Sequence, residues 1–176
     1  DGVLTFDPTA LSYLLKATGP VEVAGQIINA ENVVQVTLSD VYEKYETDNN
    51  ARKIFLINII KAVSQKIEDK QFSANDLLAE MIHPINQHRI LFYSVDESEQ
   101  KILERSQISG AISNELDNQY RLIIQNTSGN KMDYYLKREL KLETLSCGAK
   151  PQTKVTFILT NVASKSVKLP AYVAGR

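Results

Sequence analysis

The stretch GNKMDYYLKRELKLE, residues 129–143, decides the fold class, because it must be either a helix or a strand. Its residue propensities and the spacing of its apolar residues point to different answers. RELKLE has good helix propensity. From residue 132 to 142, however, five of the six even positions are apolar or aromatic, and the odd positions from 131 to 143 are charged except Tyr135. A period of two is typical of a half-buried strand. We therefore expect a long strand from Lys131 with buried even positions and exposed odd positions.

The turn NTSGN, residues 126–130, precedes this strand. Gly129 allows a positive φ, and Asn126 and Asn130 are short amides that hydrogen-bond to their own backbone. The odd positions beside the turn are candidates for a surface that faces an anionic polymer or a glycan. The alternative is that they form the solvated face of the strand. The candidate residues are Lys131, Asp133, Tyr135, Lys137 and Lys141.

Upstream of residue 112 the chain reads mostly as helices. Capping residues and apolar spacing predict helices over 8–18, after Asn29, over 47–67, over 73–82 and over 96–106, with strands at 2–6, 21–25 and 89–95. The helix after Asn29 is expected to place Val34, Leu38, Val41 and Tyr45 on one face. Pro84 is expected to end or kink its helix. Downstream, QYRLIIQN (119–126) and KVTFILTN (154–161) read as strands.

These patterns predict an α+β protein with two portions. Residues 1–112 form an α/β portion, and residues 113–176 form an antiparallel β portion. The clearest helix, 47–67, carries an apolar stripe at helical spacing. The stripe consists of Leu56, Ile59, Ile60, Val63 and Ile67.

Composition narrows the function classes. Of the 176 residues 43% are hydrophobic and 23% charged, which is ordinary for a soluble globular domain. The lone Cys147 excludes an internal disulfide and a thiolate zinc site. Two histidines are too few for most His-based metal sites. No catalytic, phosphate-loop or nucleic-acid motif is present. We expect no metal site and no nucleic-acid partner, and the sequence names no cofactor and no catalytic residue.

Charge is distributed unevenly along the chain. Residues 1–118 carry 10 basic and 18 acidic side chains, a net charge of −8, whereas residues 119–176 carry 10 basic and 3 acidic ones, a net charge of +7. Two explanations are open: the halves attract each other, or the C-terminal half meets an anion.

Asp48, Arg52 and Lys53 stand at the expected start of the helix over 47–67. Backbone N–H groups and the helix dipole favour anions at such a position, so the three residues are candidates for binding a phosphate. The alternative is an acidic N-cap followed by two exposed basic residues.

Four stretches together resemble a bacterial envelope family known as domain of unknown function four-thousand-and-twelve. They are DGVLTFDPTALSYLLKATGPVEV (1–23), HRILFYSVDESEQKIL (88–103), NTSGNKMDYYLKRELK (126–141) and the closing LTN…LPAYVAG (159–175). The resemblance extends over nearly the whole chain. It implies an extracytoplasmic domain that follows a membrane anchor upstream of Asp1, and it implies no established activity.

Residues 1–70 also resemble the second half of LytR-CpsA-Psr proteins, which transfer glycopolymers from polyprenyl phosphate carriers. This resemblance implies a mixed sheet between helices, with Arg52 and Asp48 matching a phosphate-gripping arginine and an acid. The second arginine of that family falls near Phe55, and the acid before its Gly-Gly-Val run is replaced by Lys16-Ala17-Thr18. The resemblance therefore supports the expected fold and the location in the cell envelope, and it weakens the case for a catalytic role.

The resulting expectation is an extracytoplasmic binding or structural module of the bacterial envelope, membrane-anchored in its full length. One alternative is a divergent glycopolymer phosphotransferase acting on polyprenyl-phosphate-linked substrates. Another is a protein–protein interaction module. The expected partners are an anionic envelope polymer or polyprenyl phosphate.

Overall fold

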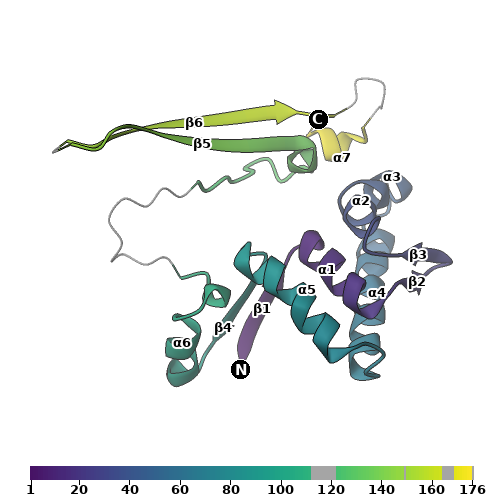
Figure 1. Ribbon diagram of the computed structural model, residues 1–176. Helices are drawn as coiled ribbons and strands as arrows, with labels where there is room; N and C mark the ends of the chain where they lie inside the picture. The colour runs from purple at the N-terminus through teal and green to yellow at the C-terminus, as the bar shows by residue number, and fades with distance from the viewer. Residues whose placement is uncertain (112–121, 149, 164–168, 176) are drawn as a thin grey trace. The chain divides into compact units, whose positions relative to one another are not determined.

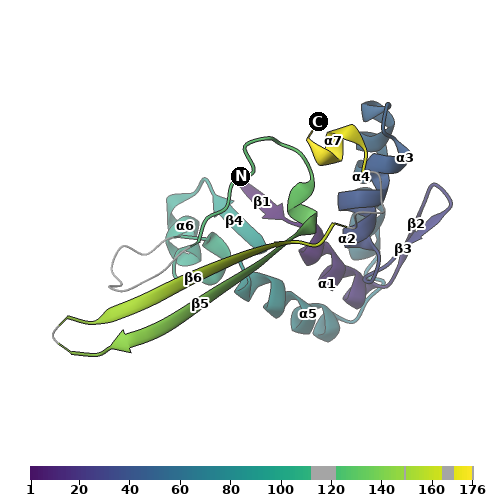
Figure 2. The same cartoon turned by 90° about the horizontal axis from the view of Figure 1, so that it is seen from above.

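The chain folds as two compact units in a computed structural model that describes residues 1–111, 122–148, 150–163 and 169–175 (Figures 1 and 2). Unit 1 is Asp1–Ile123 and unit 2 is Ile124–Arg176, whereas the sequence placed the boundary after residue 112. Helices and small antiparallel sheets make up the described residues, which confirms the α+β class.

Unit 1 packs helices against two small sheets. The described strands pair only antiparallel, β1 with β4 and β2 with β3, and not in the mixed sheet that the LytR-CpsA-Psr resemblance implied. Its elements are β1 (Gly2–Phe6), α1 (Pro8–Thr18), β2 (Val21–Val23), β3 (Gln26–Ile28), α2 (Val33–Gln35), a π-helical turn (Val36–Asp40), α3 (Val41–Lys44), α4 (Asn49–Glu68), α5 (Ala74–Asn86), β4 (Ile90–Ser94), α6 (Glu97–Leu103) and a 3-10 turn (Gln107–Ser109).

Helix α1 begins and ends at the residues that the sequence indicated. The Asp7 carboxylate accepts a hydrogen bond from the Ala10 N–H at 2.8 Å, and Pro8 occupies the first turn, where its missing N–H costs nothing. Gly19 ends the helix with a φ of 77° and donates its N–H to the Leu15 carbonyl. These local bonds position α1 between α5 and α2, against which it packs.

Helix α4 is the main support of the core of unit 1. Its buried side chains include Phe55, Ile59 and Val63, which recur at helical spacing. The expected stripe is therefore partly core, but Ile60 and Ile67 stay 39% and 36% exposed. The other fully apolar core positions come from α1, β2, β3 and the segment after them. They are Ala10, Leu11, Leu15, Val21, Val23, Ile28, Val33, Val36 and Val41.

The helix after Asn29 departs from the expectation. Its N-cap position is Asn32, while the Asn29 carboxamide accepts a hydrogen bond from the Asn32 N–H at 2.9 Å in the preceding turn. The π-helical turn widens the helix and changes the angular phase of the residues after it. Of the expected face Val41 is buried, whereas Val34, Leu38 and Tyr45 are half-buried. Val33, Val36 and Tyr42 are buried as well, so the buried positions do not follow the expected face.

Helix α5 is capped by Ser73, whose hydroxyl accepts from the Asp76 N–H at 3.4 Å. Pro84 does not end this helix, which continues to Asn86. Pro84 is buried, and its carbonyl accepts the Arg89 N–H at 2.8 Å where the chain turns into β4.

Unit 2 is built on one antiparallel hairpin. Strand β5 (Leu136–Ser146) pairs with β6 (Gln152–Asn161), Leu140 lying opposite Phe157. A 3-10 turn (Met132–Tyr135) precedes β5, and a short helix α7 (Ala171–Ala174) follows later. The strand therefore begins five residues later than expected, because Lys131 and the four residues of the 3-10 turn precede it.

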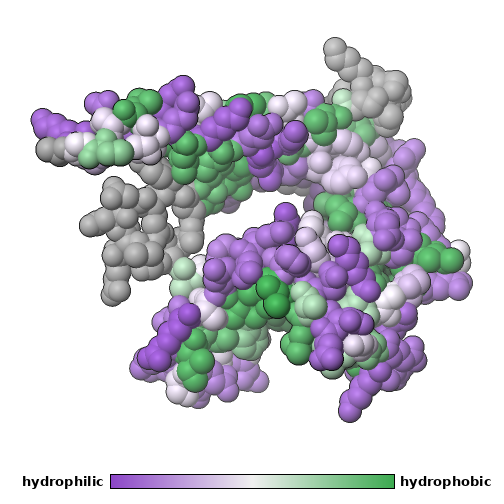
Figure 3. All heavy atoms as spheres, viewed as in Figure 1, coloured by the Kyte–Doolittle hydropathy of each residue, from purple (hydrophilic) through white to green (hydrophobic). Residues whose placement is uncertain are grey.

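The hairpin confirms the strand but contradicts the burial that alternation predicted. Leu140 is 42% exposed and Leu142 is 52% exposed. Opposite residues of an antiparallel pair share a face, so these leucines and the β6 side chains form one apolar, uncovered face (Figure 3). The β6 members of that face are Val155, Phe157 and Leu159. Alternation specifies which residues share a face, but only a second layer can bury that face.

The expected strand over 119–126 falls partly outside the described residues, since 119–121 are not described. Residues 122–126 form no strand, and Leu122, Ile123 and Ile124 are 43%, 75% and 37% exposed. A strand needs a hydrogen-bonding neighbour, and no described strand pairs with this segment.

Candidate functional site

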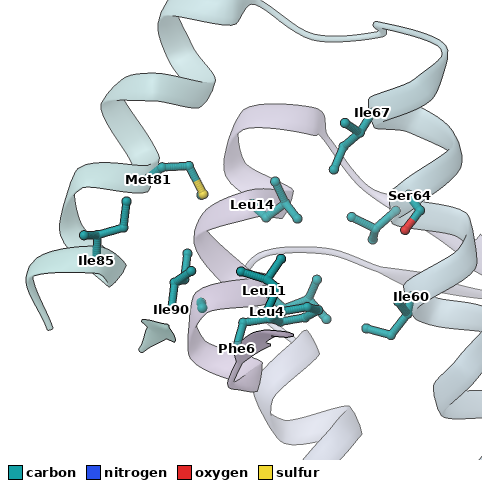
Figure 4. A pocket seen from close by; sticks show the side chains of 12 residues that line it. Leu4, Phe6, Leu11, Leu14, Ile60, Ser64, Ile67, Met81, Ile85 and Ile90 are labelled. Carbon is teal, nitrogen blue, oxygen red and sulfur yellow. The ribbon is translucent and has the colours of Figure 1, made fainter. Parts of the chain in front are cut away.

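An open apolar cavity of about 360 Å³ lies in unit 1 between β1, α1, α4, α5 and β4 (Figure 4). Every lining side chain except Ser64 is apolar. In Figure 4, α5 contributes its side chains from one side and α4 from the other, with α1 and β1 between them. The lining residues are Leu4, Phe6, Ala10, Leu11, Leu14, Ile60, Val63, Ser64, Ile67, Met81, Ile85 and Ile90.

Local structure explains why these side chains converge. Even positions of β1 share one face of the strand, which places Leu4 and Phe6 together, and Ile90 lies opposite Phe6 on that face. On α4, Ile60, Ser64 and Ile67 are spaced three and four residues apart and therefore lie on one side of the helix. The cavity exists because the apolar faces of these surrounding helices and strands do not pack directly against one another.

A second hollow of about 250 Å³ adjoins the first, and both are lined by Phe6, Leu11 and Ile60. This second hollow has a more polar wall, because Asp7, Thr37 and Tyr42 contribute to it. The two hollows share these three residues but differ in character, because only the second carries a carboxylate and two hydroxyl-bearing residues.

Arg52 contacts Tyr42, which lines the second hollow. Its guanidinium carbon lies 4.7 Å from the centre of the Tyr42 ring, and Nη2 donates to the Asn49 carboxamide at 2.5 Å. The side chain is only 8% exposed, so the expectation of two exposed basic residues was wrong for Arg52, although Lys53 is exposed. Asp48 caps α4 by accepting from the Ala51 N–H at 2.9 Å.

Anion binding at Asp48, Arg52 and Lys53 stays a prediction. The structure assigns the Asp48 carboxylate to capping and the Arg52 guanidinium to contacts within the protein. A phosphate would therefore have to compete with Asn49 and Tyr42 for this guanidinium.

The five polymer-facing candidates do not share one strand face. Lys131, Asp133 and Tyr135 lie in or beside the 3-10 turn, because the chain coils there instead of extending. Asp133 forms an ion pair with Arg138 at 2.6 Å, and the Tyr135 ring meets Tyr134 edge-on at 4.9 Å. Only two of the five candidates are therefore strand positions.

Those two positions are Lys137 and Lys141 of β5, which do share the polar face of the hairpin. Acidic residues alternate with them: Lys137 Nζ lies 3.6 Å from Glu139, and Glu143 pairs with Lys154 of β6 at 2.9 Å. The face is a mixed row of charges, so any attraction for a polyanion is weak and screened by salt.

The predicted turn residues form a connected hydrogen-bond cluster. The Asn126 carboxamide donates to the Asn130 carbonyl at 3.0 Å and to Asp133 at 2.6 Å, and Asn130 accepts from the Met132 N–H at 3.0 Å. Gly129 has a φ of 65°, as the turn required. These bonds account for the motif as a structural device that orders the start of β5.

The histidines, the cysteine and the acidic residues form no further candidate site in the part of the chain that the structure describes. No group of three or more His, Cys, Asp or Glu side chains there could hold a metal ion. Cys147 is exposed, and His83 stacks on Tyr13 at 5.9 Å between ring centres. None of the described helices is both long and apolar enough to cross a membrane.

Sequence reasoning missed the cavity entirely. The apolar stripe on α4 was visible in the sequence, whereas residues 2–6 were predicted only as a strand, with no face assigned to a cavity. Exposure of Leu4 (57%), Phe6 (42%) and Leu78 (68%) depends on packing between elements, which no local pattern encodes.

Comparison with known proteins connects the start of the chain to one family. A sequence model described as "Protein of unknown function (DUF4012)" matches residues 1–42. These residues comprise β1, α1, β2, β3 and α2 and continue into α3. No curated protein and no solved structure matches the chain. The wider resemblance to this family and the one to LytR-CpsA-Psr proteins stay predictions.

Proposed function

We propose that the chain is an extracytoplasmic binding domain of the bacterial envelope, and that unit 1 takes up the hydrocarbon chain of a polyprenyl phosphate. The observation that carries this proposal is the apolar cavity between α1, α4 and α5. Its volume of about 360 Å³ lies within the ~300–1,000 Å³ typical of small-molecule sites.

The character of the walls favours hydrocarbon over a polar ligand. Ser64 is the only lining residue with a side-chain hydroxyl, so a sugar or nucleotide would lose its hydration without new hydrogen bonds. Each buried CH₂ group contributes about 0.8 kcal/mol, and a branched isoprenoid chain offers several such groups for burial in the cavity. The adjoining hollow with Asp7, Thr37 and Tyr42 suits the point where such a chain meets its polar head.

The envelope setting rests on the resemblances given above, and the family match covers residues 1–42 of the first of them. The charge of +7 in residues 119–176 agrees with an environment rich in anionic polymers. An anionic envelope polymer is accordingly retained as the second expected partner.

The two alternatives have unequal support. A glycopolymer phosphotransferase would need cationic groups turned toward a phosphate, but Arg52 is committed to Asn49 and Tyr42. A protein–protein module is favoured by the uncovered face of the hairpin, where Leu140, Leu142 and Leu159 are exposed.

The test compares three small ligands by thermal shift. Farnesyl phosphate carries both chain and head, farnesol carries the chain alone, and pyrophosphate carries the charge alone. We expect both farnesyl compounds to raise the melting temperature by mass action and pyrophosphate to have no effect. A rise with pyrophosphate and none with farnesol would place the recognition in an anion site and refute the proposal.

Matched variants on α4 locate the site. Ser64→Phe adds a ring at the lining of the cavity, whereas Asn58→Phe adds the same ring at an exposed position of the same helix that does not line it. We expect Ser64→Phe to weaken farnesol binding at least tenfold and Asn58→Phe to leave it unchanged. Equal effects of the two variants would contradict binding in this cavity.

A further inference from the structure

The apolar cavity of unit 1 is open to solvent, and α4 and α5 form two of its sides. Leu4 and Phe6 line the cavity and yet are 57% and 42% exposed, so the walls do not close over them. In Figure 4, α1 and β1 lie between α4 and α5. The residues just outside the lining on these two helices therefore determine what the opening can contact.

On α4 the apolar surface continues beyond the cavity. Ile57 lies three residues before the lining residue Ile60, on the same side of the helix, and the two are 51% and 39% exposed. Ile54, three residues before Ile57, is 58% exposed. Single exposed apolar side chains are normal on a protein surface, but three at this spacing form a continuous patch.

On α5 the apolar surface also continues outward. Leu78 and Ile82 are four residues apart, and they are 68% and 57% exposed. At helical spacing they lie beside Met81 and Ile85, which line the cavity. Both sides of the opening therefore carry exposed apolar side chains. We call this set the rim, and its members are Ile54, Ile57, Ile60, Leu78 and Ile82.

The charges beside the rim are basic on α4. Residues 1–118 carry a net charge of −8, but α4 has four basic residues and a single acidic one, Glu68, at its last position. Lys53 and Lys61 lie four residues before and after Ile57 and therefore flank it on the same side of the helix. Both lysines are exposed, and neither forms an ion pair with a described residue.

Helix α5 keeps its acidic residues away from the rim. Asp76 and Glu80 are each two residues from Leu78, and they lie nearly opposite to it because a helix turns about 100° per residue. No rim residue has a carboxylate three or four positions away on its own helix. The opening is thus bordered by apolar side chains and lysines, in a half of the chain that is otherwise acidic.

We propose that the rim docks on the surface of a bilayer that contains anionic lipids, so that a hydrocarbon chain enters the cavity directly from the membrane. This inference rests on the proposed function, because a polyprenyl chain resides in a bilayer. Apolar side chains flanked by lysines are typical of helices that lie in a membrane interface. The apolar tips enter the boundary between headgroups and acyl chains, while the lysine stems extend and their ammonium groups meet lipid phosphates.

A tryptophan scan tests the location of the contact. The chain contains no tryptophan, so a single introduced indole reports only its own surroundings. Ile57→Trp places the indole on the rim, and the control Ile102→Trp places it on α6, at an isoleucine that is 69% exposed and does not line the cavity. The probes are vesicles of phosphatidylcholine with about a quarter phosphatidylglycerol, which supplies the anionic surface.

We expect these vesicles to shift the emission of Ile57→Trp to shorter wavelength, and brominated acyl chains to quench it. The emission of Ile102→Trp should stay unchanged. Equal responses of the two variants, or no response of either, overturn the proposal.

Vesicle sedimentation of the whole chain measures the contribution of charge. Lys61→Gln should weaken binding to the anionic vesicles about fivefold, whereas Lys101→Gln on α6 should leave it unchanged. Both lysines are exposed, so both variants should keep the wild-type melting temperature. Binding that is insensitive to Lys61→Gln but lost when Lys137 and Lys141 become glutamine overturns the proposal, because the contact then runs through the hairpin.

The farnesol thermal shift separates this inference from the proposed function. A farnesol shift without any binding to the anionic vesicles refutes the docking and leaves the cavity as a lipid site. Binding through the rim without a farnesol shift supports the docking and refutes lipid uptake by the cavity.

Discussion

Asp7 and Arg89 are 82 residues apart in the chain, yet their side chains form an ion pair with 2.6 Å between Oδ2 and Nη1. The other Asp7 oxygen caps α1 through the Ala10 N–H, and the Asp7 N–H bonds to the Arg89 carbonyl. One carboxylate thus ties the end of the β1–β4 ladder to the start of α1, beside the two hollows of unit 1.

This double role predicts a graded response at Asp7. Asp7→Ala removes the cap and the ion pair and should lower the free energy of unfolding by about 1–2 kcal/mol. Asp7→Ser keeps a capping oxygen and should cost less than about 1 kcal/mol. Denaturant melts of both variants measure this, and a double-mutant cycle with Arg89→Ala should give a coupling of about 0.2–1 kcal/mol. Equal losses for alanine and serine would show that capping contributes nothing.

Neighbouring isoleucines on α4 test the core assignment. Ile59 is 0% exposed and Ile57 is 51% exposed. Ile59→Ala should lower the free energy of unfolding by about 2–5 kcal/mol. Ile57→Ala should change it by at most about 0.5 kcal/mol, since alanine also favours a helix. Similar losses at both positions in denaturant melts would contradict the packing of α4.

The hairpin provides a third comparison. Leu140 would cost about 2–5 kcal/mol on truncation if it were core. Because it is 42% exposed, we expect Leu140→Ala to cost less than about 1 kcal/mol. Circular dichroism melts of this variant beside Lys141→Ala measure the difference. A large loss confined to Leu140→Ala would mean that another layer covers the apolar face.

Arg52 is expected to be structural. Losing its hydrogen bond to Asn49 and its stacking on Tyr42 should lower the free energy of unfolding by about 1–3 kcal/mol in Arg52→Ala. Lys53→Ala, one position along the same helix, should stay within about 0.5 kcal/mol. If pyrophosphate instead raised the melting temperature and Arg52→Ala removed that rise with no loss of stability, the anion-site interpretation would be correct.

Asp96 gives a pH-dependent prediction. The Ser98 hydroxyl, followed by the backbone N–H groups of Glu99 and Ser98, stabilises the carboxylate and lowers its pKa below the ordinary value of 3.8. The contribution to stability is therefore complete above the unfolded pKa and is lost as pH falls through the folded one. An NMR titration should give a lower midpoint for Asp96 in the protein than in a peptide of residues 94–100. Ser98→Ala should raise it, and identical midpoints would refute the cap.

Much of the local structure could be predicted from short-range chemistry. Caps at Asp7, Ser73 and Asp96 were identifiable because each side chain bonds to a backbone N–H two or three residues away. Strands over 131–143, from alternation, and over 154–161, from an apolar run before a turn, were predicted, and β5 and β6 lie over most of these residues. The predicted strand start at Lys131 was wrong, because the Asn126–Asn130–Asp133 bonds stabilise a 3-10 turn that alternation cannot reveal, and the strand begins at Leu136.

The sequence by itself determined the starts of α1, α4, α5 and α6 to within two residues, and it determined which residues of β5 share a face. These properties depend on neighbours within about four positions, the reach of a helical turn or of the strand pleat. Only the tertiary structure decided that Asp7 meets Arg89, that Arg52 is buried, that Leu140 is exposed and that β1 borders an apolar cavity. Burial is a relation between elements distant in the chain, and the apolar side chain that predicts a buried face looks the same in sequence when nothing covers it.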